Sequence, residues 1–187
     1  GTCTGFVCAK TDLTPFLNQL PFQLTGAQQR AISQVAADLS RSVPMNRLVQ
    51  GDVGSGKTMV AAAAAFLAYQ NGYMSALMAP TEILAQQHYQ GLSKLLGPLG
   101  MRLGLLCGSM TAKEKRQVKE SIALGMVDLV IGTHALLSRD VDLPNLALVI
   151  TDEQHRFGVR QRAMLGEKSV HPHTLVMSAT PIPRTLA

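Results

Sequence analysis

The sequence contains no long apolar run and opens without a leader segment. The longest apolar run, Met59–Tyr69, has 11 of the 187 residues, whereas a membrane-spanning helix needs about 20. We therefore expect no contact with a membrane. No charged and then apolar segment opens the chain, which argues against secretion. These two absences predict a cytoplasmic protein.

Cysteines are also few: Cys3, Cys8 and Cys107 are the only three. Three cysteines cannot build a disulfide framework, and no two of them have the two-residue spacing typical of a zinc site. Reduced thiols are expected, with Cys107 in the core. His171 and His173 lack nearby cysteines or acids, so we do not interpret them as metal ligands.

Aromatic residues make up only 4% of the chain, and tryptophan is absent. A base-stacking surface is therefore not expected, and any contact with nucleic acid would be to the backbone and independent of sequence. The net charge of +5 permits a polyanionic partner without identifying one. Four basic residues share one predicted helix, which we interpret as a solvated basic face: Lys113, Lys115, Arg116 and Lys119.

Helical and strand-like segments alternate along most of the chain. Residues 1–21 have little periodicity and contain two prolines, so we expect there a poorly ordered lead-in or the tail of a preceding element, followed by one domain over residues 22–187. Capping residues, glycines and periodicity predict helices over 25–39, 57–70, 81–96 and 111–125. Short apolar runs predict strands over 48–50, 73–79, 101–107, 127–131, 146–151 and 174–177. Strands separated by long crossovers pair in parallel, so the expected fold class is α/β, a doubly wound, mostly parallel sheet with helices on both faces.

A glycine-rich segment between a predicted strand and a predicted helix matches G-x-x-x-x-G-K-[ST] at every required position. Its residues are Gly51, Asp52, Val53, Gly54, Ser55, Gly56, Lys57 and Thr58. Glycines let successive backbone N–H groups point at phosphate oxygens, and the following helix adds its positive end. Lys57 can reach the β and γ phosphates, and the Thr58 hydroxyl can bind Mg²⁺. The alternative is a glycine-rich turn that only connects a strand to a helix.

Two carboxylates, Asp152 and Glu153, follow the apolar run 146–151. At the carboxyl end of a parallel strand they would lie on the same sheet edge as the glycine-rich segment. Asp152 could hold Mg²⁺, and Glu153 could orient and deprotonate an attacking water. An Asp-Glu sequence is common in turns and means little alone. Together with the glycine-rich segment it favours ATP hydrolysis over simple ATP binding.

Several segments resemble the motifs of superfamily 2 helicases. Asp152-Glu153-Gln154-His155 is similar to the DExH box, and Ser178-Ala179-Thr180 is similar to the S-A-T motif that couples hydrolysis to movement. Residues 79–88 and 132–134 resemble motifs Ia and Ib, which contact the nucleic-acid backbone. Residues 24–28 resemble the glutamine motif that reads adenine.

This resemblance implies a RecA-like P-loop NTPase fold, with ATP and Mg²⁺ as cofactors and DNA as a partner. The implied roles are catalysis for Lys57, Asp152, Glu153 and His155, adenine binding for Gln28, DNA-backbone contact for Thr81, Thr133 and Arg156, and coupling for Ser178 and Thr180. His155 would connect the hydrolysis site to the S-A-T loop.

Residues 48–58, 152–158 and 180–186 are similar to the RecG branched-DNA helicases, and the resemblance covers about residues 20–187. It implies the first motor domain of an enzyme that remodels branched DNA and stalled replication forks in recombination and repair. Transcription-repair coupling factors share most of these residues but typically read glutamate where this chain has Gln154, so the motor domain of such a factor is the alternative function among enzymes.

RecG proteins also have a wedge domain and a second motor domain with an arginine finger, and we expect both to lie outside this chain. Because an arginine finger can contribute about 10³–10⁵ in rate in related reactions, weak or no turnover is expected of the chain alone. A nucleotide-gated DNA-binding module without turnover is the alternative from another class.

Overall fold

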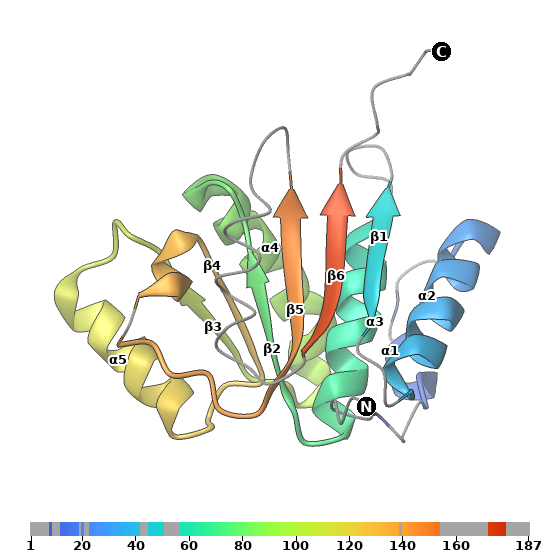
Figure 1. Cartoon of the computed structure of the whole chain (residues 1–187), viewed down its shortest axis with the longest axis horizontal. Helices are drawn as coiled ribbons and strands as arrows, with labels where there is room; N and C mark the ends of the chain where they lie inside the picture. The colour runs from blue at the N-terminus through green and yellow to red at the C-terminus, as the bar shows by residue number, and fades with distance from the viewer. Residues whose placement is uncertain are drawn as a thin grey trace, which may run out of the picture.

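The computed structural model describes most of the chain, namely residues 8, 12–18, 20, 23–41, 45–50, 57–138, 140–153 and 172–178. Its centre is a six-stranded parallel sheet in the order β1-β6-β5-β2-β4-β3 (Figure 1). The strands are β1 Asn46–Gln50, β2 Met74–Met78, β3 Leu103–Leu106, β4 Leu129–Gly132, β5 Leu146–Glu153 and β6 His173–Ser178. The sequence-based expectation of a parallel α/β sheet is confirmed.

Two helices, α1 Thr14–Asn18 and α2 Gly26–Leu39, precede β1, and three connect successive strands: α3 Lys57–Gln70, α4 Glu82–Leu96 and α5 Ala112–Ala123. Two short 3₁₀ helices, η1 Gly97–Leu99 and η2 His134–Leu137, follow α4 and β4. Threonines begin three of these helices as the sequence predicts: Thr25, Thr81 and Thr111 each accept a hydrogen bond from the backbone N–H three residues on. Such caps pair N–H groups that a helix start would otherwise leave without partners.

Alternate residues of the sheet enter two separate cores. Leu77, Ile131 and Ile150 pack with α2, α3 and α4 on one face. Ala76 and Val130 pack on the other face with Ile122 of α5, with η2 and with the segment that leads into β5. Because both faces are covered, nearly every residue of the central strands is apolar, which explains why the sequence shows runs rather than alternation.

Helix α3 packs against the sheet through an alanine-rich segment. Residues 61–65 are all alanine, and each is at most 1% exposed. Alanine side chains are small, so the helix can approach the sheet closely without losing helix propensity. The observed bounds of α3 agree with the predicted helix over 57–70.

Where the structure describes it, the amino-terminal segment contains a packed helix, which departs from a poorly ordered lead-in and leaves the tail of a preceding element as the other expectation. Residues 14–18 form α1, and the fully buried ring of Phe16 stacks on Phe66 with 6.1 Å between ring centroids. The Gln70 side chain donates to the carbonyl of Asp12 at 2.7 Å. Pro15 lies in the first turn of α1, where proline is tolerated, so it does not break the helix. This part of the lead-in therefore packs on the domain.

Within the part of the chain that the structure describes, no helix combines the length and apolarity that crossing a membrane requires.

Candidate active site

The carboxyl ends of the parallel strands lie on one edge of the sheet, at the top of Figure 1. Strand β1 ends at Gln50, immediately before the glycine-rich segment, and α3 begins at Lys57. Residues 51–56, with Gly51, Asp52, Val53, Gly54, Ser55 and Gly56, lie outside the described residues. The strand before this segment and the helix after it are both present, which is the context that gives the motif its meaning.

The acidic residues are brought to this edge by the pairing of β5 with β6. Ser178, the last residue of β6, is in register with Gln50 of β1 on one side and with Glu153 of β5 on the other. Two strand spacings therefore separate Gln50 from Glu153, about 10 Å. Asp152 and Glu153 thus end a strand close to the one that precedes the glycine-rich segment.

Strand β5 is longer than the sequence predicts. It was expected to end at Thr151, but it continues through Asp152 and Glu153, which pair with Met177 and Ser178. Aspartate is a poor strand former, and the backbone pairing with β6 overrides that local preference. The two acidic residues are therefore held by a sheet ladder rather than by a turn.

Asp152 is a buried acid with two different oxygens. It is 2% exposed, and its Oδ2 lies 2.7 Å from Nε2 of His88 on α4. Its Oδ1 is also buried and has no hydrogen-bond partner among the described residues. A buried carboxylate oxygen without a partner is unfavourable unless a ligand completes it, so the site suits a cation.

A cation there would need ligands beyond the described protein residues. No group of three or more His, Cys, Asp or Glu residues that could hold a metal occurs in the described ranges. Mg²⁺ is usually held by one or two protein oxygens together with phosphates and waters. One buried aspartate oxygen therefore fits Mg²⁺ that arrives with a nucleotide.

His88 is a site residue that the sequence reasoning did not single out, although it belongs to the segment that resembles motif Ia. A signal for it exists, because Ala85, Leu92 and Leu96 form the fully buried stripe of α4, and His88 falls on the same stripe. A histidine at such a position needs a polar partner. The sequence could not name Asp152 as that partner, because 64 residues separate them.

The candidate DNA contacts Thr81 and Thr133 follow neighbouring strands, since Met78 of β2 is in register with Gly132 of β4. Thr81 is exposed and caps α4, with Oγ1 accepting from the Leu84 N–H at 3.2 Å. Thr133 is only 2% exposed, and its Oγ1 accepts from the Ala135 N–H at 3.5 Å. The Thr133 hydroxyl thus caps the start of η2 in this structure. Its contact with DNA stays a prediction.

Glu82 ties the start of α4 to the loop after β3. Its carboxylate accepts from the Ser109 N–H at 3.0 Å and also from the Ser109 hydroxyl. The loops at this edge are thereby connected to one another, from β3 through α4 to β5.

The remaining predicted site residues are placed as follows. Gln28 lies in the first turn of α2, where its side chain accepts from the Thr25 N–H. Thr58 is the half-buried second residue of α3, and Ser178 ends β6. His155, Arg156 and Thr180 lie outside the described residues. His173 is fully buried, and its Nδ1 accepts from the Met45 N–H at 2.8 Å.

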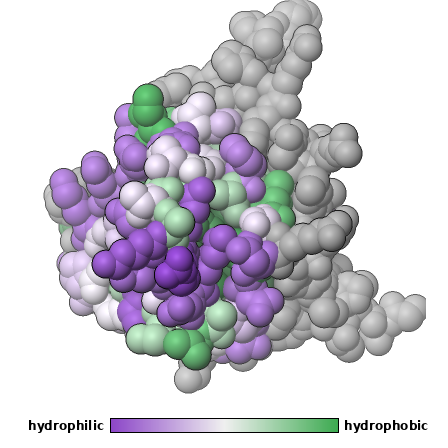
Figure 2. Space-filling model, turned by 90° about the vertical axis from the view of Figure 1, so that its left-hand side faces the viewer, coloured by the Kyte–Doolittle hydropathy of each residue, from purple (hydrophilic) through white to green (hydrophobic). Residues whose placement is uncertain are grey.

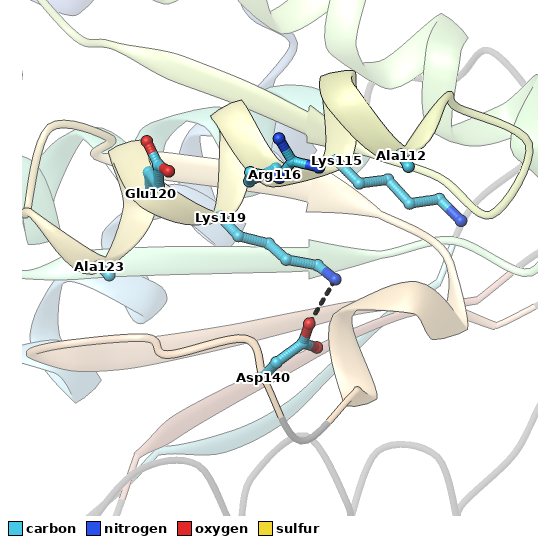
Figure 3. Close-up of a pocket in the computed structure, with 7 residues that line it drawn as sticks. All are labelled: Ala112, Lys115, Arg116, Lys119, Glu120, Ala123 and Asp140. Atoms are coloured by element: carbon cyan, nitrogen blue, oxygen red, sulfur yellow. Dashed lines mark hydrogen bonds and ion pairs between the residues drawn. The ribbon is translucent and has the colours of Figure 1, made fainter.

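The basic face of α5 lines a groove of about 520 Å³ with Asp140 on its other wall (Figure 3). Lys119 donates to Asp140 at 2.7 Å, while Lys115 and Arg116 point away from that carboxylate. The hydrogen bonds from Lys119 and then Ser138 lower the pKa of Asp140 from 3.8 to about 2. Glu120 also lines the groove, so positive and negative groups are mixed there. Figure 2 shows a mostly hydrophilic surface on this side, as expected of a solvated face.

The parallel sheet, the strand–helix context of the glycine-rich segment and the buried aspartate at the same edge define a RecA-like α/β domain. The sequence matches the DEAD/DEAH box helicase family over residues 25–187, and the chain belongs to this family. Membership implies that the chain binds a nucleotide.

Among curated proteins, the chain is 54% identical to the ATP-dependent DNA helicase RecG of Aquifex aeolicus over 91% of its length. It is 53% identical to that of Escherichia coli K12, also over 91%. It covers 22% of the first relative and 25% of the second, so it spans about a quarter of their lengths.

Solved structures agree with this relationship. A RecG bound to a three-way DNA junction superposes with a TM-score of 0.83 and 46% identity, covering 98% of this chain and 25% of that one. The helicase MrfA superposes with a TM-score of 0.65 at 18% identity, covering 91% of this chain and 29% of that one, which supports the fold alone.

Proposed function

We propose that this chain is the first motor domain of a RecG-type ATP-dependent DNA helicase that remodels branched DNA and stalled replication forks in recombination and repair. The observation that carries the proposal is the buried Asp152 carboxylate, whose Oδ1 has no partner among the described residues. It lies at the sheet edge where β1 leads into the glycine-rich segment. A cytoplasmic location is part of the same proposal.

ATP would be held by residues 51–58. The backbone N–H groups of this segment and the positive end of α3 favour the phosphates, and Lys57 neutralises part of their charge. Thr58 and Asp152 would bind Mg²⁺, which when bound offsets phosphate charge as the bond to the γ phosphate breaks. Gln28 would recognise the adenine.

Glu153 would orient the attacking water and accept its proton, because phosphoryl transfer needs little from the protein beyond position and charge. His155, Ser178 and Thr180 would transmit the state of the nucleotide to the DNA contacts. Of these residues, Ser178 ends β6 in register with Glu153, which supports a short path between them.

DNA is proposed to pass over the carboxyl edge, in contact with Thr81, Thr133 and Arg156 through phosphate oxygens. A similar RecG structure is bound to a three-way DNA junction, and the net charge of +5 is compatible with a polyanion. Since the chain spans about a quarter of its relatives, a second motor domain and a wedge domain are proposed to complete the enzyme.

The first experiment tests nucleotide binding by the full chain with a fluorescent ATP analogue. Lys57→Ala is expected to weaken binding about 10- to 100-fold, as the loss of one charged hydrogen bond to phosphate predicts. Lys94→Ala, at an exposed position in the last turn of α4, removes the same charge far from the site and should leave affinity unchanged. Equal affinity of Lys57→Ala and the unaltered chain would refute the proposed phosphate site.

The second experiment tests turnover in a protein that also contains the second motor domain. Glu153→Gln should abolish DNA-stimulated ATP hydrolysis while ATP binding persists. If hydrolysis is unaffected, Glu153 does not activate the water. If the unaltered protein binds ATP and DNA without any turnover, the nucleotide-gated binding module becomes the better description.

A further inference from the structure

His88 lies on the inward-facing stripe of α4, which is otherwise made of buried apolar side chains. The inward stripe of α4 consists of Ala85, Leu92 and Leu96, each at most 1% exposed. His88 lies between Ala85 and Leu92 on this stripe, and its side chain is 13% exposed. A polar ring at such a position is stable only where its nitrogen finds a partner.

That partner is the Oδ2 atom of Asp152, 2.7 Å from Nε2 of His88. An ionised carboxylate only accepts hydrogen bonds, so opposite an ionised Asp152 the donor in this contact is Nε2 of His88. The contact joins the middle of α4 to the end of β5. The Asp152 side chain is 4% exposed, so water does not compete for Oδ2.

The two oxygens of Asp152 therefore differ in their environment. Oδ2 is occupied by His88, whereas Oδ1 is buried and has no partner among the described residues. A hydrogen bond to one oxygen restricts rotation of the carboxylate and so fixes the direction of the other. Loss of a group that orients a metal-binding carboxylate in this way typically lowers metal affinity by about 10- to 100-fold.

The start of α4 is also anchored. Thr81 caps its first turn, and Glu82 accepts two hydrogen bonds from Ser109. Helix α4 is therefore tied to the loop after β3 at its start and to the end of β5 through His88.

We propose that His88 is a positioning residue for Mg²⁺: it holds Oδ2 of Asp152 so that Oδ1 is directed at the cation that accompanies the nucleotide. This inference rests on the proposed function, because it requires ATP at residues 51–58. Helix α4, whose first residues resemble motif Ia, would then contribute to the ATP site as well as to DNA contact. The competing explanation is that the hydrogen bond only anchors α4 to the sheet.

The test is a Mg²⁺ titration of ATP-analogue binding by the full chain, with binding in EDTA as the reference. His88→Leu keeps a side chain of similar size but has no hydrogen-bond donor. In this variant the Mg²⁺ concentration that gives half of the maximal increase in ATP-analogue affinity should rise about tenfold or more. Affinity in EDTA should be unchanged. His88→Gln places an amide N–H near the position of Nε2 and should stay within about threefold of the unaltered chain.

Controls separate positioning from anchoring. Gln90→Leu changes an exposed residue of the same helix and should leave the Mg²⁺ midpoint unchanged. If His88→Leu does not fold, His88→Asn replaces it, because its shorter amide does not reach Asp152 and the same rise is expected. Thermal unfolding of each variant is measured alongside.

An unchanged Mg²⁺ midpoint in the variant without the contact overturns the inference while leaving the proposed function intact. Equal loss of affinity with and without Mg²⁺, together with no rescue by His88→Gln, also overturns it and assigns His88 to anchoring. Absence of nucleotide binding by the unaltered chain overturns the proposed function, and the inference falls with it.

Discussion

Gln28 and Thr25 exchange two hydrogen bonds at the start of α2. The Thr25 N–H donates to Oε1 of Gln28 at 2.8 Å, and the Gln28 N–H donates to Oγ1 of Thr25 at 3.1 Å. This reciprocal arrangement is a capping box. The residue proposed to recognise adenine thus also stabilises the helix that carries it.

The two roles of Gln28 can be separated by substitution. Gln28→Glu keeps the oxygen acceptor for the Thr25 N–H but replaces the amide donor, so we expect unchanged stability within about 0.5 kcal/mol and a loss of preference for ATP over GTP. Gln28→Ala should lose the capping hydrogen bond as well as the preference for ATP, and its free energy of unfolding should be lower by about 1 kcal/mol. Urea unfolding and competition binding measure the two effects. A full ATP preference in Gln28→Glu would argue against adenine recognition by this amide.

The packing of α1 predicts that the lead-in contributes to stability. Phe16 is fully buried against Phe66, so Phe16→Ala should lower the free energy of unfolding by about 3 kcal/mol or more. The neighbouring Leu17 is 44% exposed, and Leu17→Ala should cost less than about 1 kcal/mol. Chemical denaturation gives both values. If the two variants are equally stable, α1 is not part of the core.

Gly132 is required by a close approach of strands rather than by its backbone angles. A Cβ built there would lie 2.2 Å from the carbonyl oxygen of Leu106. Gly132→Ala should therefore destabilise the domain by about 1–3 kcal/mol through forced separation of β3 and β4.

Gly91 is the matched control for that substitution. It lies within α4, and nothing lies within 4 Å of a Cβ built there. Gly91→Ala should stabilise the helix by about 0.5–1 kcal/mol. Thermal melts of both variants test the pair, and a stabilising Gly132→Ala would show that the strands can separate without loss.

The pKa of Asp140 offers a test of the ion pair on α5. Lys119 and Ser138 lower it from 3.8 to about 2. Because the pKa is lower in the folded chain, the pair stabilises the fold above about pH 4, and that contribution is lost as the pH falls toward 2. In Lys119→Ala the pKa of Asp140 should rise toward 3.8. It should stay somewhat below 3.8, because the hydrogen bond from Ser138 remains. Lys115→Ala should leave it unchanged, and carboxyl titration by NMR distinguishes the two variants.

Much of the fold follows from local chemistry in the sequence. Thr25, Thr81 and Thr111 cap helices where expected, because a cap depends on residues only three positions apart. The apolar runs predicted a sheet covered on both faces for the same local reason. The strand order could not be predicted, because it depends on how distant strands choose neighbours.

Contacts between distant residues explain what the sequence reasoning missed in the candidate site. Asp152 was singled out from its position after an apolar run, yet its partner His88 is 64 residues away. The extension of β5 through Glu153 depends on pairing with β6. Phe16 was overlooked because its apolar partner Phe66 lies in α3, and nothing in residues 1–21 indicates that contact.

The buried alanines of α3 limit which amino-acid substitutions this helix can accept. Since residues 61–65 are each at most 1% exposed and together cover more than one turn of the helix, a larger side chain at any of them would push α3 away from the sheet or from α2. Lys57 begins the same helix, so such a displacement would move the ammonium group relative to Asp152. Larger side chains in this segment, which lies outside the proposed phosphate-binding residues 51–58, are therefore expected to weaken the proposed nucleotide binding as well as the stability of the fold.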